Sequence, residues 1–316
     1  MKFSIIVLMY NASIRSVLLT LKSILLQSFS EYEIIIADDG SLNRWELEIR
    51  DYFDKWRFTN YKFAPSQENV GTVKNILRAL SYSDGKYIKC LGAGDLLFDS
   101  NALSIVYEKM ERERIPWIFG DMEGYGIFDE KITNKSFFAP IDKKPYIKKD
   151  RGMIKRNIVV LQDYISGASM FFDKYFLEDK LNEVKNSVKY IEDILQVLAV
   201  LQEEFPVALF RKLVIYEVGT GISTERKRDS RLEKDMDQFN GYLYQNYSDE
   251  LIERRRQRQY MIRQGGFLRK HVYLLLHFPR RVFLKIYIYW KHRDARKGLG
   301  FLDDPDFYQE FGLQRG

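Results

Sequence analysis

The sequence predicts an α/β protein in which an open, mostly parallel sheet is flanked by helices. Short apolar runs, typical of strands buried on both faces, alternate with amphipathic helical segments up to residue 120. Several of these runs end directly in acidic residues. Sheets of this class bind ligands at the carboxyl ends of their strands, so the acidic residues mark the expected site.

Strands are expected where short apolar runs stand between turn-forming residues. These runs are 3–8, 33–37, 61–64, 87–91 and 117–120. Helices are expected where apolar residues recur at spacings of three and four. These segments are 13–28 (with Ser13 as the cap), 71–85, 100–114 and 190–204.

The remaining parts of the chain are less regular. Residues 121–165 lack a clear period and are rich in lysine, so we expect a long surface excursion there. Residues 207–223 are rich in strand-forming residues and end in a loop, 219–223, that carries two glycines. The N-terminal apolar run is too short for a signal peptide or a membrane span, and we interpret it as the first strand.

The composition excludes several kinds of site. The single cysteine, Cys90, allows no disulfide within the chain and no cysteine-based zinc site, which is compatible with a reducing compartment. The three histidines all lie after residue 270 and have no metal-binding spacing. The net charge is +6, and the chain becomes strongly basic after Glu225.

Residues 265–293 are apolar and aromatic but are interrupted by Pro279, Arg280 and Arg281. Neither half reaches the ~20 apolar residues of a transmembrane helix. The pattern indicates an element that lies on an anionic membrane surface, with a solvated helical face as the alternative. A basic tail also fits nucleic acid, but no motif that reads DNA or RNA accompanies it, so no nucleic-acid partner is expected.

Six segments occur in an order that resembles the family 2 glycosyltransferases with the GT-A fold. They are SIIVLMYN, EIIIADDGS, ENVGTVKN, YIKCLGAGD, SGASMFF and YIEDILQ. The resemblance covers about residues 1–223 and implies a catalytic domain there, followed by a helical extension at 224–316. It also implies transfer of a sugar, with inversion, from a nucleotide diphosphate donor that is usually a UDP-sugar, and use of a divalent metal ion.

The resemblance assigns the nucleotide to residues that follow the first strands. Asp38 and Asp39 match the family's first acidic motif, where a carboxylate accepts hydrogen bonds from the base or the ribose. The alternative is an ordinary Asp-Gly turn. Tyr10 and Asn11 would border the same pocket. Two further donor-side polar positions, for which plain surface roles are the alternative, are Asn69 and Lys74.

The loop Gly92-Ala93-Gly94-Asp95 departs from the family, which usually has Asp-x-Asp or Asp-Asp here. Only Asp95 remains, and we expect it to hold Mn²⁺ or Mg²⁺ together with waters and substrate phosphate oxygens. Gly94 would let the backbone approach the diphosphate closely. A plain tight turn is the alternative, and the missing carboxylates leave the metal dependence open.

Glu192 and Asp193 stand near the start of the expected helix 190–204, where the family has its general base. Asp193 is the expected base, and we expect only one of the two to face the site because adjacent helical residues point in different directions. The alternative is a pair that complements the helix dipole. Gly167 and Ala168 would lie beside the acceptor and the diphosphate, and 219–223 resembles the segment that closes over the donor.

Together these features predict a cytoplasmic glycosyltransferase on the inner face of the cell membrane. It would transfer a sugar from a UDP-sugar to a lipid-linked saccharide acceptor in the synthesis of a cell-surface polysaccharide. A nucleotidyltransferase, one rival, would need a basic loop after the first strand, where only Arg15 stands. The other alternative is a non-catalytic GT-A-like protein that binds a nucleotide or sugar or serves as a scaffold.

Overall fold

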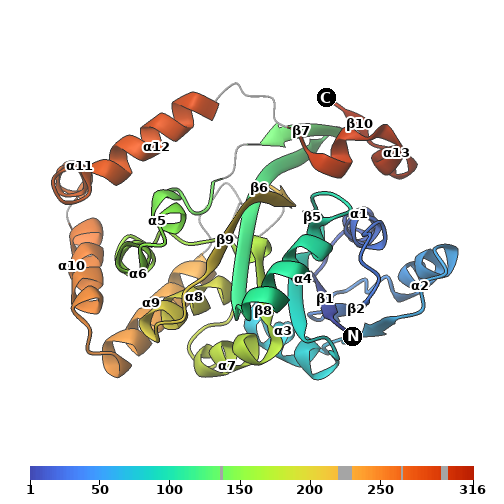
Figure 1. Ribbon diagram of the computed structural model, residues 1–316, viewed down its shortest axis with the longest axis horizontal. Helices are drawn as coiled ribbons and strands as arrows, with labels where there is room; N and C mark the ends of the chain where they lie inside the picture. The colour runs from blue at the N-terminus through green and yellow to red at the C-terminus, as the bar shows by residue number, and fades with distance from the viewer. Residues whose placement is uncertain (136–137, 220–229, 265, 293–297) are drawn as a thin grey trace.

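The structure is a computed structural model that describes residues 1–135, 138–219, 230–264, 266–292 and 298–316. In this part of the chain, one mixed sheet runs through the molecule, with helices packed on both faces (Figure 1). The strand order is β10-β7-β6-β8-β4-β1-β2-β3, with β9 beside β6 and β5 beside β9. The predicted α/β class is confirmed.

The sheet has a parallel half and a mixed half. The parallel half consists of β1 (Phe3–Met9), β2 (Tyr32–Asp38), β3 (Tyr61–Phe63) and β4 (Tyr87–Gly92). In the mixed half, β6 pairs antiparallel with β7 and β8 and parallel with β9. The strands of this half are β5 (Leu96–Leu97), β6 (Trp117–Phe128), β7 (Lys131–Lys135), β8 (Met170–Asp173), β9 (Val207–Glu217) and β10 (Gln314–Arg315).

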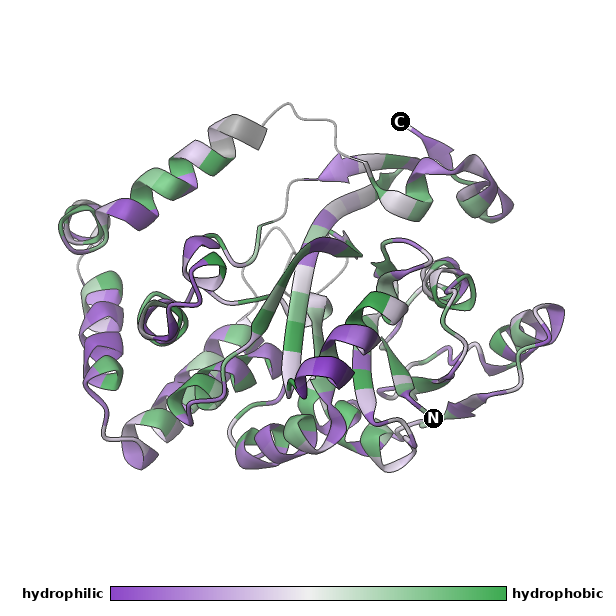
Figure 2. Cartoon of the chain, in the orientation of Figure 1, coloured by the Kyte–Doolittle hydropathy of each residue, from purple (hydrophilic) through white to green (hydrophobic). Residues whose placement is uncertain are grey.

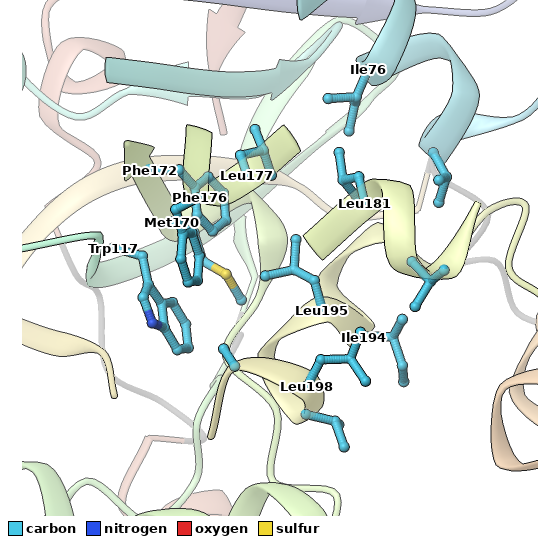
Figure 3. Packing of buried hydrophobic residues seen from close by; sticks show 14 of the residues in the cluster. Ile76, Trp117, Met170, Phe172, Phe176, Leu177, Leu181, Ile194, Leu195 and Leu198 are labelled. Atoms are coloured by element: carbon cyan, nitrogen blue, oxygen red, sulfur yellow. The ribbon is translucent and has the colours of Figure 1, made fainter. Parts of the chain in front are cut away.

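Each face of the sheet supports a core because alternate residues of a strand point to opposite sides. On one face, Ile6 and Ile35 join the residues of α3, α7 and α8. On the other, Ile5 and Ile34 join those of α1, α2 and α4. Figure 3 shows part of the first core, where residues of α7 and α8 pack near Trp117 and Phe172.

In the first half of the chain, α1, α3 and α4 follow the strands as the periodicity predicts, whereas α2 was not predicted. Ser13 caps α1, its hydroxyl accepting from the Ser16 N–H. The helices up to β9 are α1 (Ile14–Leu25), α2 (Glu46–Lys55), α3 (Thr72–Ser81), α4 (Ala102–Glu113), α5 (Lys144–Ile147), α6 (Arg151–Val159), α7 (Lys174–Val184) and α8 (Leu195–Leu201). Those after β9 are α9 (Ser230–Asn246), α10 (Glu250–Gln264), α11 (Gly266–His277), α12 (Pro279–His292) and α13 (Pro305–Tyr308).

The long surface excursion expected for 121–165 is wrong. This segment extends β6, forms the β6–β7 hairpin and then continues into α5 and α6. Glycines weaken a strand signal, and β6 carries them where its neighbours approach closely. A Cβ at Gly124 would lie 2.6 Å from the Lys135 carbonyl oxygen, so this strand requires glycine at that position.

Residues 299–316 return to the sheet and differ from the helical extension expected for 224–316. β10 pairs with β7, and Leu302 and Phe307 are buried against Leu19 and Tyr125. The Lys22 ammonium donates to the Phe307 carbonyl at 2.8 Å. The proposed domain boundary after residue 223 falls within 220–229, outside the described residues.

Between β9 and this returning segment, α10, α11 and α12 curve around α5 and α6 (Figure 1). Within the described ranges, no helix is both long enough and apolar enough to cross a membrane. α10 is hydrophilic along most of its length (Figure 2). Several large apolar side chains of α11 and α12 are nevertheless exposed, including Leu276, Phe283 and Trp290.

The returning segment should contribute to the stability of the sheet. We expect Phe307→Ala to lower the free energy of unfolding by about 3–5 kcal/mol, because it opens a cavity where the ring is only 2% exposed. Phe283→Ala, at a ring 62% exposed, is the matched control and should change stability by less than about 0.5 kcal/mol. Denaturant unfolding measures both, and equal small effects would show that 299–316 does not pack on the sheet.

Candidate active site

A cleft of about 430 Å³ lies at the carboxyl ends of the parallel strands. Its walls come from the end of β1, the loop after β2, the β4–β5 loop, the turn before β8 and the turn before α8. The structure brings together seven of the residues predicted from the sequence. They are Tyr10, Asp39, Asp95, Gly167, Ala168, Glu192 and Asp193.

Asp39 lies directly after β2 and is only 4% exposed. One carboxylate oxygen accepts from the Val70 N–H and the other from the Gly71 N–H, both at 2.9 Å. Burial raises the pKa of this carboxyl, and the two backbone hydrogen bonds oppose the rise. Asp39 therefore fixes the start of α3 and keeps further lone pairs for a ligand in the cleft.

Five other predicted donor-side residues do not line the cleft, and one of them is Gly94 of the β4–β5 loop. Asp38 accepts from the Ser41 N–H and lies 3.7 Å from Arg44, and the Asn11 side chain accepts from the Leu42 N–H, so both shape the loop after β2. The other two line a separate surface hollow beside Lys189; they are Asn69 and Lys74.

The β4–β5 loop is a tight turn that also presents Asp95 to the cleft. The Asp95 N–H donates to the Gly92 carbonyl, and one Asp95 carboxylate oxygen accepts from the Glu217 N–H at 3.0 Å. Gly94 has a φ of +105°, and a Cβ there would lie 1.9 Å from a Glu217 carboxylate oxygen, so this position requires glycine. Burial raises the pKa of Asp95 to about 7.

The fit of this loop to a metal ion is limited to one side chain. Among the described residues, no group of three or more His, Cys, Asp or Glu is placed to hold a metal ion. Asp95 lines the cleft beside Gly92, where the family usually has a carboxylate. A metal ion here would therefore take most of its oxygen ligands from substrate phosphates and water, as Mg²⁺ commonly does.

Glu192 and Asp193 both line the cleft, so the expectation that only one would face it is wrong. They belong to a 3-10 turn, Glu192–Ile194, that precedes α8 rather than to the helix itself. Burial raises the pKa of both carboxyls, and the charge of Asp193 raises that of Glu192 further. The Gly167 N–H donates to Asp193 and favours its charged form.

Two residues that sequence reasoning missed hold this cleft in place. Lys89, fully buried in β4, donates to the Ala168 carbonyl and, at 3.1 Å, to the Met170 carbonyl. The sequence feature that could have identified Lys89 is a lysine within an otherwise apolar strand. Asp235 of α9 accepts from the N–H groups of Lys189, Tyr190 and Ile191, so a helix after residue 223 positions the turn that carries Glu192 and Asp193.

The segment expected to close over the donor, 219–223, lies outside the described residues except for Gly219.

The family profile described as glycosyl transferase family 2 matches residues 4–178. The chain belongs to this family. A relative from Mycoplasma genitalium, described as an uncharacterized glycosyltransferase, is 27% identical over 197 residues. That alignment covers 61% of this chain and 59% of the relative, so the chain matches less than two thirds of that protein's length.

Solved structures of similar fold include TarS of S. aureus, residues 1–349. The complex of TarS with UDP-GlcNAc has a TM-score of 0.58 at 16% identity and covers 84% of this chain and 74% of TarS 1–349. Another structure of the same TarS fragment has a TM-score of 0.53 at 16% identity, covering 94% of this chain and 93% of that one. At this identity the likeness shows the fold alone, which is that of a GT-A glycosyltransferase.

Gly167 should be required for the position of the two carboxylates. A Cβ at this residue would lie 2.6 Å from a Glu192 carboxylate oxygen, so Gly167→Ala must displace Glu192. We expect turnover to fall about 10- to 100-fold, because small misplacements of reacting groups are costly. Gly152→Ala is the control, since its Cβ would meet the nearest atom at an ordinary 3.6 Å. Equal turnover of the two variants in a sugar-transfer assay would contradict the role given to Gly167.

Proposed function

We propose that this chain transfers a sugar from a UDP-sugar to a hydroxyl group of a saccharide acceptor, by direct displacement with inversion. The observation that carries the proposal is the convergence of Asp39, Asp95 and Asp193 on one cleft from three different parts of the fold. Membership of glycosyltransferase family 2 supports the sugar transfer. A protein of similar fold was solved with UDP-GlcNAc, which supports a UDP-sugar donor.

In this proposal Asp39 accepts hydrogen bonds from the uracil or the ribose. Its carboxylate is already oriented by Val70 and Gly71, so little freedom is lost when the nucleotide binds. The Tyr10 ring, 47% exposed at the cleft, has an apolar face on which a base can stack.

Asp193 acts as the general base. It takes the proton of the acceptor hydroxyl as the oxygen bonds to the anomeric carbon, while the bond to the diphosphate breaks and UDP leaves with the electron pair. Burial gives Asp193 a stronger affinity for a proton than an exposed aspartate has, and the Gly167 N–H keeps its charged form accessible. Glu192, whose pKa is raised further, holds its proton more readily and is the neighbour rather than the base.

Asp95 would hold Mn²⁺ or Mg²⁺. When bound, the ion supplies positive charge that stabilises the leaving diphosphate. Gly92 and Ala93 line the cleft beside Asp95, so phosphate oxygens would meet little side-chain bulk there, whereas the position of the missing Cβ of Gly94 faces Glu217. Lys89 secures Ala168 beside the reacting groups, and because burial lowers the pKa of its ammonium to about 7, the positive charge that it places near Asp95 depends on the pH.

The acceptor is lipid-linked and belongs to cell-surface polysaccharide synthesis, and the chain works as a peripheral protein on the inner face of the membrane. The exposed side chains of Phe283 and Trp290 on α12, together with the basic residues of the same helix, support this part of the proposal.

Thermal unfolding with UDP, GDP, CMP and NAD, each with and without Mn²⁺, tests the donor. UDP at 100 times its dissociation constant should add about 2.7 kcal/mol to the stability, a rise of several degrees in Tm. We expect Asp95→Ala to remove the part that needs Mn²⁺ and Asp39→Asn to weaken UDP with or without metal. No response to any nucleotide would favour a non-catalytic protein, and a response to UDP that Mn²⁺ leaves unchanged would remove the metal site.

Asp193→Asn should lower turnover about 10²- to 10⁴-fold and leave UDP binding intact, because the amide cannot accept the proton. In the unaltered protein, turnover should fall as the pH drops and Asp193 becomes protonated. Because burial raises the pKa of this carboxyl, that fall should begin at a higher pH than for an exposed aspartate. Glu192→Gln is the matched control and should keep the acidic limb of the pH–rate profile. An unchanged acidic limb in a partly active Asp193→Asn variant would exclude Asp193 as the base.

A further inference from the structure

Cationic side chains are buried where α10 and α12 meet the segment 159–164. Arg255 is fully buried and Arg258 is 8% exposed, both on α10. Arg281 in the first turn of α12 has a side chain only 14% exposed, and Lys285, which is more exposed, follows one turn later. Figure 2 shows α10 as mostly hydrophilic, so this helix presents charged side chains even toward its packed face.

Arg255 has structural partners that account for its burial. Its guanidinium donates to the Asn240 side chain at 2.9 Å, the Val159 carbonyl at 2.8 Å and the Tyr164 hydroxyl at 3.0 Å. These bonds connect α9, α10 and the end of α6. Arg255 therefore needs no further ligand.

Arg258 and Arg281 converge on Gln162 and are left with unused donors. Arg258 donates to the Gln162 side chain at 3.1 Å, and Arg281 donates to the Gln162 carbonyl at 3.5 Å. Within the described residues, the Arg258 Nε and Arg281 Nη1 groups are buried and have no acceptor. A buried donor without an acceptor destabilises a protein, so these two groups indicate a missing partner.

The charges of the cluster are also unbalanced. Asp163 lies 3.7 Å from Arg281, and its two oxygens already accept from the Ile141 and Asp142 N–H groups. Burial, and then the neighbouring arginines, lower the pKa of Arg258 to about 10. Burial and the charge of Arg281 likewise lower the pKa of Lys285.

We propose that Arg258, Arg281 and Lys285 form a binding site for a phosphate group. A phosphate supplies the missing acceptors and the missing negative charge, and planar guanidinium groups match its geometry. The site lies close to the cleft, because Tyr164 lines the cleft and its hydroxyl group interacts electrostatically with both Arg258 and Arg281. The phosphate belongs either to the acceptor or to a phospholipid headgroup under α12. The acceptor source rests on the proposed function, whereas phosphate binding does not.

The test compares the full chain with Arg258→Met, Arg281→Met and Arg254→Met, using calorimetric titration with inorganic phosphate at constant ionic strength. We expect the first two variants to bind phosphate at least about tenfold more weakly, since each loses a charged hydrogen bond. Arg254, on the same helix but 54% exposed and paired with Glu250, is the matched control and should bind as the unaltered chain does. UDP binding should be unchanged in all of them, so a failure here is distinct from a failure of the proposed function.

Methionine at 258 or 281 should also leave the phosphate-free Tm unchanged or higher, because it removes one of several mutually repelling buried charges. If either variant does not fold, Lys285→Gln, at an exposed position, should still weaken phosphate binding. Equal affinity in all variants, or no phosphate binding by the unaltered chain, would overturn the proposal.

Sedimentation with phosphatidylglycerol vesicles separates the two sources. Loss of vesicle binding in Arg281→Met, with retention in Arg254→Met, assigns the site to a lipid headgroup. Retained vesicle binding together with lost phosphate binding in Arg281→Met assigns it to the acceptor. Vesicle binding that all variants keep, with unaltered phosphate affinity, would show that the cluster serves neither.

Discussion

The burial of several carboxyl groups around one cleft is the constraint on which the site depends. Asp39 and Asp95 are buried, Glu192 and Asp193 are partly buried in the wall of the cleft, and burial raises the pKa of each. Such groups remain in place only where backbone N–H groups or positive charges compensate them. The fold supplies the Val70, Gly71 and Gly167 N–H groups and the buried Lys89, whose own pKa burial lowers to about 7, so an incoming cation would interact strongly with these carboxyl groups.

The cleft also depends on residues outside the part of the chain that matches the family. Asp235 lies in α9, yet it accepts from three consecutive N–H groups just before Glu192. Arg255 in α10 similarly supports Tyr164 on the wall of the cleft. The helices after β9 thus hold the walls of the cleft in position.

The strands of the parallel half and its helices α1, α3 and α4 could be predicted because each has a strong local pattern, and so could the cleft residues at the ends of β2 and β4. Other features have no such pattern. The residue before α2, Trp45, has a φ of +52° and makes no side-chain cap, so this helix lacks a start signal. The glycines of β6 weaken the sequence pattern that would indicate a strand. Lys89 and Asp235 gain their roles only from carbonyl and N–H groups far along the chain, which no local pattern records.

The return of 299–316 to the sheet has a consequence for the way the chain is made. β7 is an edge strand until β10 pairs with it. Leu302 and Phe307 fill a core that also contains Leu19 and Tyr125, which are synthesised much earlier. During translation the nascent sheet therefore has one unpaired edge and one uncovered apolar surface. Both favour association with other chains. The basic helices α10, α11 and α12 are synthesised during this interval. Their positive charge would make unfinished copies of the chain repel one another.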